Sequence, residues 1–125
     1  MKTKSTMFGN DTKENITLMP TISAKELVED EIKFKIKSVN VKDGVTSKYF
    51  PEGHRVAFVV IQIGTTEYLL AASQTVLLKK FAFVRGKLDE GDEEFAEYLN
   101  STEFVIQYTQ GKNNEYMDIY EVTED

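Results

Sequence analysis

The chain has 125 residues, a formal net charge of −6 and no cysteine. Its length indicates one domain, and a hydrophobic content of 41% is enough for an ordinary core. The lack of cysteine excludes disulfides and thiolate metal sites, and the acidic balance argues against a protein that covers nucleic acid with its whole surface. No apolar run is long enough to span a membrane, so no membrane partner is expected.

The first twenty residues differ from the rest of the chain. Residues 1–20 are polar and lack hydrophobic periodicity, which predicts a flexible N-terminal arm before a single domain over residues 21–125. They also lack the apolar segment of a signal peptide. Just after the arm, Ser23 and Glu26 have the spacing of a capping box, which predicts a short helix over residues 23–30.

Residues 32–41, IKFKIKSVNV, alternate apolar and basic side chains and predict a β-strand. Lys33, Lys35 and Lys37 share its polar face. This basic row either protects an exposed sheet edge from aggregation or contacts phosphates. The apolar parity changes after Ser38, which predicts a β-bulge or a sharp bend inside the strand.

A long irregular loop is predicted from residue 42 to residue 55. It carries two aromatic side chains, Tyr49 and Phe50, followed by His54 and Arg55. Aromatic side chains in such a loop either pack back onto the domain or serve a ligand.

The most apolar stretch, RVAFVVIQIGTTEYLLAA, covers residues 55–72 and predicts a β-hairpin with its turn at Gly64 and Thr65. In this register Ile61 pairs with Tyr68 and Val59 pairs with Leu70. The face that contains these residues is the expected core. The opposite face mixes polar groups with Phe58, Val60 and Leu69, which suggests self-association or a binding surface.

Two further elements follow the hairpin. Ser73 is placed to cap a helix from residue 74 to about residue 83, with Gly86 as its stop signal. The acidic residues between positions 89 and 97 lack the ligand spacing of a calcium loop, so a solvated surface is expected there.

The last block, residues 102–122, predicts a second hairpin with its turn at residues 111–114. Its expected core face carries Phe104, Ile106, Tyr108, Met117 and Ile119. The other face carries Val105, Gln107, Thr109, Tyr116, Asp118 and Tyr120, and the turn presents Lys112 and Asn113. For the tyrosines of this second face, cross-strand packing and base stacking both remain open.

The order of elements predicts a mainly β fold with one or two helices. Five strands, with a helix between the third and the fourth, is the order of the OB-fold, a five-stranded Greek-key barrel.

That order, together with the segments ISAKELVEDEIKFKIKSV, HRVAFVVIQ and SQTVLLKKF, resembles the small OB-fold single-stranded-DNA-binding proteins of bacteriophages. The resemblance covers about residues 22–122. It implies that the second and third strands and the loops joining strands one to two and four to five bind the DNA. The residues of this chain at those places are Tyr49, Phe50, His54, Arg55, Phe58, Tyr68, Lys112, Asn113 and Tyr116. Lys33 and Lys35 of the basic row are added as candidate phosphate contacts.

The resemblance also implies a role in phage DNA replication or recombination, in the cytoplasm of the host, alongside other replication or recombination proteins. A homo-oligomer, either a dimer or a tetramer, is expected from the apolar residues outside the core. The alternative is an OB-type protein-interaction module that binds no nucleic acid, which the acidic balance favours.

Catalysis is not expected. His54 is the only histidine, with no cysteine partner and no serine motif around it. No glycine-rich phosphate loop is present either. The sequence therefore predicts neither an enzyme nor a metal site or cofactor.

Overall fold

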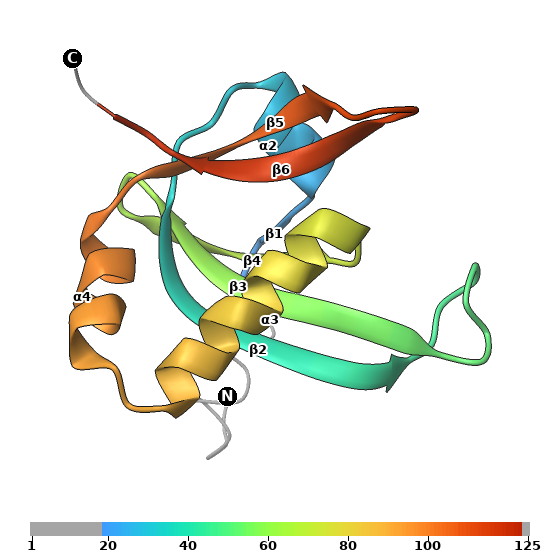
Figure 1. Ribbon diagram of the computed structural model, residues 1–125, viewed down its shortest axis with the longest axis horizontal. Helices are drawn as coiled ribbons and strands as arrows, with labels where there is room; N and C mark the ends of the chain where they lie inside the picture. The colour runs from blue at the N-terminus through green and yellow to red at the C-terminus, as the bar shows by residue number, and fades with distance from the viewer. Residues whose placement is uncertain (1–18, 124–125) are drawn as a thin grey trace, which may run out of the picture.

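The computed structural model describes residues 19–123 (Figure 1). The elements are β1 (Thr21–Ile22), α2 (Ala24–Glu29), β2 (Lys35–Val45), β3 (His54–Ile63), β4 (Thr66–Ala72), α3 (Thr75–Asp89), α4 (Glu93–Ser101), β5 (Phe104–Gln110) and β6 (Glu115–Glu121). The predicted mainly β fold is confirmed, but this part of the chain has three helices and six strands instead of one or two helices and five strands. Apart from its last two residues, the predicted arm lies outside the described residues.

Between residues 19 and 123 the strands form two sheets that do not close into the predicted barrel. One sheet has the order β1-β4-β3-β2 and the other consists of β5 and β6. Strand β1 runs parallel to β4, with Thr21 opposite Leu69. Helix α2 contacts both β4 and β5, so it fills the space where a closing ladder between the sheets would be needed. Its Leu27 is fully buried.

The predicted capping box is confirmed at the start of α2. The Ser23 hydroxyl accepts the backbone N–H of Glu26 at 3.1 Å, and the Glu26 carboxylate accepts the N–H of Ser23 at 3.2 Å. These bonds satisfy free donors of the first turn, which lets so short a helix begin at a defined residue.

The two sheets are joined by a single antiparallel bridge within the described residues. The N–H of Phe34 donates to the carbonyl of Phe104 at 2.9 Å, and the reverse bond measures 2.7 Å. Both side chains are buried, with ring centroids 6.5 Å apart. Backbone bonding and aromatic packing therefore fix the sheets to each other at the same point.

The predicted bulge in the first long strand is confirmed. The ladder between β2 and β3 shifts register between Ile36 and Ser38, so Lys37 is the extra residue. Because of this shift, Ile36 and Val39 both point into the core despite their odd spacing. In Figure 1, β2 runs from the neighbourhood of β5 and β6 to the base of the loop that joins it to β3.

Both predicted hairpin registers are confirmed. In the first, Ile61 faces Tyr68 and Val59 faces Leu70 across the turn at residues 64–65. In the second, Ile106 faces Ile119 and Tyr108 faces Met117. The expected core faces are largely buried, but Tyr108 is exposed. Asp118, predicted on the face opposite the core, is almost fully buried, and the Lys80 ammonium of α3 lies 2.6 Å from its Oδ1.

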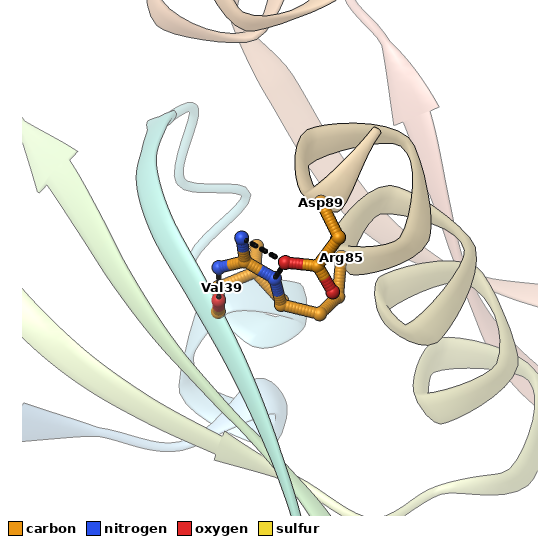
Figure 2. A network of polar contacts seen from close by, with 3 residues as sticks. All are labelled: Val39, Arg85 and Asp89. Carbon is orange, nitrogen blue, oxygen red and sulfur yellow. Dashed lines mark hydrogen bonds and ion pairs between the residues drawn. The ribbon is translucent and has the colours of Figure 1, made fainter. Parts of the chain in front are cut away.

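Helix α3 has Gln74 as its N-cap, without a side-chain cap bond, so the predicted cap by Ser73 is wrong. The predicted stop at Gly86 is also wrong, because the helix continues to Asp89. Arg85 accounts for the extra turn (Figure 2). Its Nη1 donates to the carbonyl of Val39 in β2 at 2.7 Å, while Nε and Nη2 donate to Asp89 Oδ1 at 3.0 and 2.7 Å. These bonds offset the cost of about 1 kcal/mol that glycine brings to a helix interior.

The acidic segment that follows is also helical. Asp92 caps α4, because its carboxylate accepts the N–H of Phe95 at 3.0 Å. This hydrogen bond lowers the pKa of Asp92, and Lys87 adds to the effect. The capping carboxylate therefore stays ionised at the helix N-terminus, where negative charge is favoured.

The contribution of the hydrogen bond between Arg85 and β2 to stability can be tested by replacing Arg85. We expect Arg85→Ala to lower the free energy of unfolding by about 1–2 kcal/mol, because the Val39 carbonyl and the Asp89 carboxylate both lose their donor. Asp89→Ala removes only the exposed part of the network and should cost less than about 1 kcal/mol. Urea unfolding measures both; equal losses would contradict the importance of the bond to Val39.

Candidate functional site

The sheet of β2, β3 and β4 has a face turned away from the core, here called the outer face. It comprises Lys35, Ser38, Asn40 and Lys42 of β2, Val56, Phe58, Val60 and Gln62 of β3, and Glu67, Leu69 and Ala71 of β4. The core face of β2 and β3 is packed against α3, whose Leu77 and Phe81 are buried. No element of the described residues forms a second layer over the outer face.

Phe58 lies at the centre of the outer face and is partly exposed. Its cross-strand neighbours are Asn40 on β2 and Ala71 on β4, both exposed and both short. Val60 and Leu69 form the next row and are also partly exposed. The outer face therefore has an apolar strip with an aromatic ring between small side chains.

The loop of residues 46–53, here called the aromatic loop, lies at one end of the outer face. Tyr49 is 82% exposed and Phe50 is 49% exposed. The rings of Phe50 and His54 lie 4.2 Å apart, tilted by 31°. His54 Nδ1 donates to the carbonyl of Val45 at 2.9 Å, which fixes the orientation of the imidazole. His54 pairs with Val45 at the start of β3, two steps of strand alternation before Phe58.

Two close glycines hold the base of the aromatic loop. Gly53 has φ +95, and a Cβ placed there would lie 3.0 Å from backbone atoms of Gly44. Gly44 has φ +71 and lies within the second register shift of β2, between Lys42 and Val45. The chain can therefore turn back toward His54 only with very little bulk at position 53.

Arg55 does not join the outer face. The alternation of β3 turns it to the opposite side, where it borders a shallow pocket with Ser73, Leu78 and Lys79. Its Nε donates to Asp43 Oδ1 at 2.7 Å. This hydrogen bond and the charge of Asp43 raise the pKa of Arg55. Much of its charge is therefore balanced inside the chain.

Tyr68 also lies away from the outer face. It pairs with Ile61 on the core side of the sheet and packs, half-buried, against the core. Its ring is thus separated from Phe58 by the sheet itself.

The tip of the β5–β6 hairpin carries three more of the predicted residues. Lys112 and Asn113 are exposed, and the ring of Tyr116 lies against the turn, since a Cβ at Gly111 would be 3.1 Å from it. Both this tip and the aromatic loop extend toward the right of Figure 1. Two other tyrosines of this hairpin were not among the predicted site residues: Tyr108 is exposed, and Tyr120 bonds to the Thr109 hydroxyl.

The two lysines predicted as phosphate contacts lie near the bulge. Lys33 is exposed next to the Phe34 bridge, and Lys35 lies opposite Gln62 on the outer face. Neither they nor Lys112 form an ion pair with another of residues 19–123. Their charges are therefore available to a ligand.

A second hollow, here called the aromatic groove, was not predicted from the sequence. It has a volume of about 510 Å³ and lies between α3, α4 and the C-terminal hairpin; its lining residues are Ile36, Lys79, Lys80, Phe81, Phe83, Val84, Phe95, Tyr98, Leu99, Phe104 and Ile119. Phe83 is 63% exposed at its rim. The feature of the sequence that could have indicated this groove is Phe83, an aromatic residue that lies outside the apolar stripe of its helix.

Tyr98 supplies the hydroxyl group of the aromatic groove. It donates to Glu121 Oε2 at 2.6 Å. That hydrogen bond, with a smaller contribution from burial, raises the pKa of Tyr98 to about 12. The bond links α4 to the end of β6.

Comparison with known proteins adds no relative: no protein-family model, curated protein or solved structure matches the chain. Among residues 19–123, no helix is long and apolar enough to cross a membrane. The same residues contain no group of three or more histidine, aspartate or glutamate side chains arranged to hold a metal ion. The functional argument therefore depends on the arrangement of the outer face, the loops and the groove.

The glycine contact under the aromatic loop can be tested directly. We expect Gly53→Ala to lower the free energy of unfolding by about 1–3 kcal/mol, because alanine strongly disfavours the φ at this position and its methyl group meets Gly44. Gly86→Ala, at a helical position with open space around it, is the matched control and should be neutral or stabilising. Thermal unfolding of the two variants gives the comparison, and equal losses would contradict the contact.

The bond between Tyr98 and Glu121 should give a pH-dependent term in stability. The folded pKa of about 12 lies above the unfolded value of about 10, so the contribution is complete below about pH 10 and is lost as the pH rises through 12. Ultraviolet titration should show a phenolate component near pH 12 that Tyr98→Phe lacks. Glu121→Gln should shift this component to lower pH; an unchanged titration in either variant would contradict the assignment.

Proposed function

We propose that this chain binds single-stranded DNA with little sequence preference, using the outer face and the two loops beside it. The observation that carries the proposal is a row of side chains on β3. His54, Val56, Phe58 and Val60 alternate along one strand, with Val56 buried and the other three partly exposed, and Phe50 stacks on His54. His54 and Phe58 are two steps of strand alternation, roughly 13 Å, apart. An extended strand with splayed bases can span that distance.

Aromatic stacking supports binding without sequence preference, because every base has a π-face. Tyr49, Phe50 and Phe58 offer rings that are exposed wholly or in part. None of the three needs to move out of a buried core to meet a base. A duplex hides its base faces within the helix, so this surface should prefer single strands.

Lysines border the same surface and supply the contacts to phosphates. Lys35 and Lys42 lie on β2, an edge strand, opposite Gln62 and Val56 of β3 and with solvent on their other side. Lys33 precedes the strand and Lys112 lies at the hairpin tip. The acidic groups of α4 lie elsewhere and the outer face itself carries Glu67 on β4, away from the lysines of β2, so a net charge of −6 is compatible with a local basic border.

The arrangement of strands supports an open variant of the OB-fold. The meander β2–β3–β4 is followed by helices and then by the β5–β6 hairpin, and the Phe34–Phe104 bridge links the first long strand to the fourth. A protein of this kind would protect and extend exposed strands during phage DNA replication or recombination, without catalysis.

A protein-interaction module without nucleic-acid binding is the second candidate. The acidic surface of α4 and the neutralisation of Arg55 by Asp43 favour it. In that case the outer face would receive a protein partner through Phe58 and Leu69.

Fluorescence anisotropy with a labelled poly-dT oligonucleotide tests the proposal. We expect Tyr49→Ala to weaken binding by about 5- to 150-fold, because one stacked base contributes about 1–3 kcal/mol. Tyr49 is so exposed that the fold should not change. Phe83→Ala, an exposed aromatic change on α3 at the other side of the sheet, is the matched control and should not change the affinity for an oligonucleotide too short to reach two copies of the chain.

A salt series separates the two candidates. Lys35→Gln should reduce the slope of log affinity against log salt by about 0.7, the value for one phosphate contact on a single strand. Lys79→Gln on α3 should leave the slope unchanged. No binding of poly-dT at low salt would overturn single-strand binding and leave the protein-interaction module as the better account. Equal affinity for duplex DNA would overturn the preference for single strands.

A further inference from the structure

The aromatic groove is lined by a continuous row of rings. The centroid of Phe83 is 6.5 Å from that of Phe95 in an edge-to-face arrangement, Phe95 is 5.9 Å from Tyr98, and Tyr98 is 6.1 Å from Phe104. The row runs from the exposed Phe83 to the buried Phe104. A large aromatic side chain, Phe83, is therefore exposed to solvent next to an apolar hollow. Exposed aromatic residues around an apolar centre are typical of the core of a protein interface.

The chemistry of the aromatic groove suits a protein surface better than a small polar ligand. Small-molecule sites combine an apolar wall with a few convergent polar groups that orient the ligand. Here the lining hydroxyl, that of Tyr98, is engaged by Glu121, and the ammonium of Lys80 is engaged by Asp118. The remaining lining is apolar except for Lys79 at the edge.

The two helices beside the groove carry opposite charges. Helix α3 contains four cations (Lys79, Lys80, Arg85, Lys87) and one anion (Asp89), a net charge of +3. Helix α4 contains three carboxylates (Glu93, Glu94, Glu97) and no cation, a net charge of −3. The net charges of α3 and α4 are therefore opposite in sign and equal in size.

The charges nearest the groove are not neutralised within the described chain. Lys79 lies at the α3 rim, and Glu94 and Glu97 line an adjoining hollow on α4 that shares Tyr98 with the groove. None of the three forms an ion pair with another of residues 19–123. A surface with a basic rim, an apolar centre and an acidic rim is complementary to a copy of itself turned by a half rotation.

We propose that the aromatic groove is the interface of a twofold symmetric dimer of this chain. Helix α3 of each copy lies over α4 of the other, and Phe83 of each copy enters the groove of the other. Twofold symmetry makes each contact between Lys79 and the carboxylates of α4 occur twice. The outer face takes no part, so the dimer is independent of DNA binding and presents two outer faces.

Sedimentation velocity over a range of protein concentrations, without DNA, tests the dimer. The wild-type chain should sediment as a concentration-dependent dimer. Phe83→Ser should raise the dissociation constant at least about 30-fold, the effect of losing an interface hot spot of about 2 kcal/mol. Tyr49→Ser, which removes an exposed aromatic side chain from the aromatic loop, should not change it. Circular dichroism checks that both variants stay folded.

Charge reversal tests the symmetry. Lys79→Glu alone and the double change Glu94→Lys with Glu97→Lys should each weaken the dimer, because like charges then meet at both contacts. An equimolar mixture of the two variants should dimerise again, since opposite charges then meet at both contacts. A wild-type chain that is monomeric at about 100 μM, far above the Kd of a specific dimer, would overturn the proposal. So would equal effects of Phe83→Ser and Tyr49→Ser, or a mixture that stays monomeric.

The experiments distinguish a failure of the dimer proposal from a failure of the DNA-binding proposal. A monomeric Phe83→Ser variant that keeps its affinity for a short oligonucleotide supports both proposals. A wild-type dimer that binds no poly-dT leaves the groove interface standing and removes single-strand binding.

Discussion

The antiparallel bridge between Phe34 and Phe104 is the contact on which the arrangement of the molecule depends. It is the point at which the ladders of the two sheets meet within residues 19–123. The two backbone hydrogen bonds join residues whose side chains are both buried, so the two sheets are held at a fixed angle there. Helix α2 then fills the open side, and the Lys37 bulge redirects β2 along the core. The β5–β6 tip and one wall of the aromatic groove take their positions from this contact.

Helix α3 gives the four-stranded sheet its two different sides. It covers the core face through Leu77 and Phe81, and Arg85 ties its last turn to the Val39 carbonyl. The outer face, without a covering layer, keeps Phe58 partly exposed. The same helix presents its remaining side to the aromatic groove. One element therefore separates the surface proposed for DNA from the surface proposed for a second copy.

The parts of the fold that could be predicted are those encoded by local pattern. The alternation in residues 55–72 and the turn at Gly64 specify the first hairpin down to its register, and the parity change after Ser38 specifies the bulge. Barrel closure could not be predicted in this way, because it depends on whether β4 meets β6 or is capped by β1 and α2. The predicted helix end at Gly86 was wrong for a similar reason. The helix continues because Arg85 donates a hydrogen bond to Val39, a residue of β2 that is distant in sequence.

The candidate site was predictable to the same extent. The alternation of β3 places His54 and Phe58 on one face, as strand periodicity requires, and places Arg55 and Tyr68 on the other side of the sheet. The sequence alone could not show that Asp43 neutralises Arg55, or that Lys80 reaches Asp118. The aromatic groove depends on α4, whose few apolar residues, among acidic ones, gave no clear helical signal.

The bridge also has a consequence for how the chain reaches this structure. The long ladders join segments that are neighbours in sequence, β2 with β3, β3 with β4, and β5 with β6. Such local pairings close small loops and form on a microsecond scale. The Phe34–Phe104 bridge joins positions 34 and 104 and must wait for both helices between them. The rate of folding should therefore be set by the meeting of two preformed sheets, a search whose cost is the entropy of one large loop.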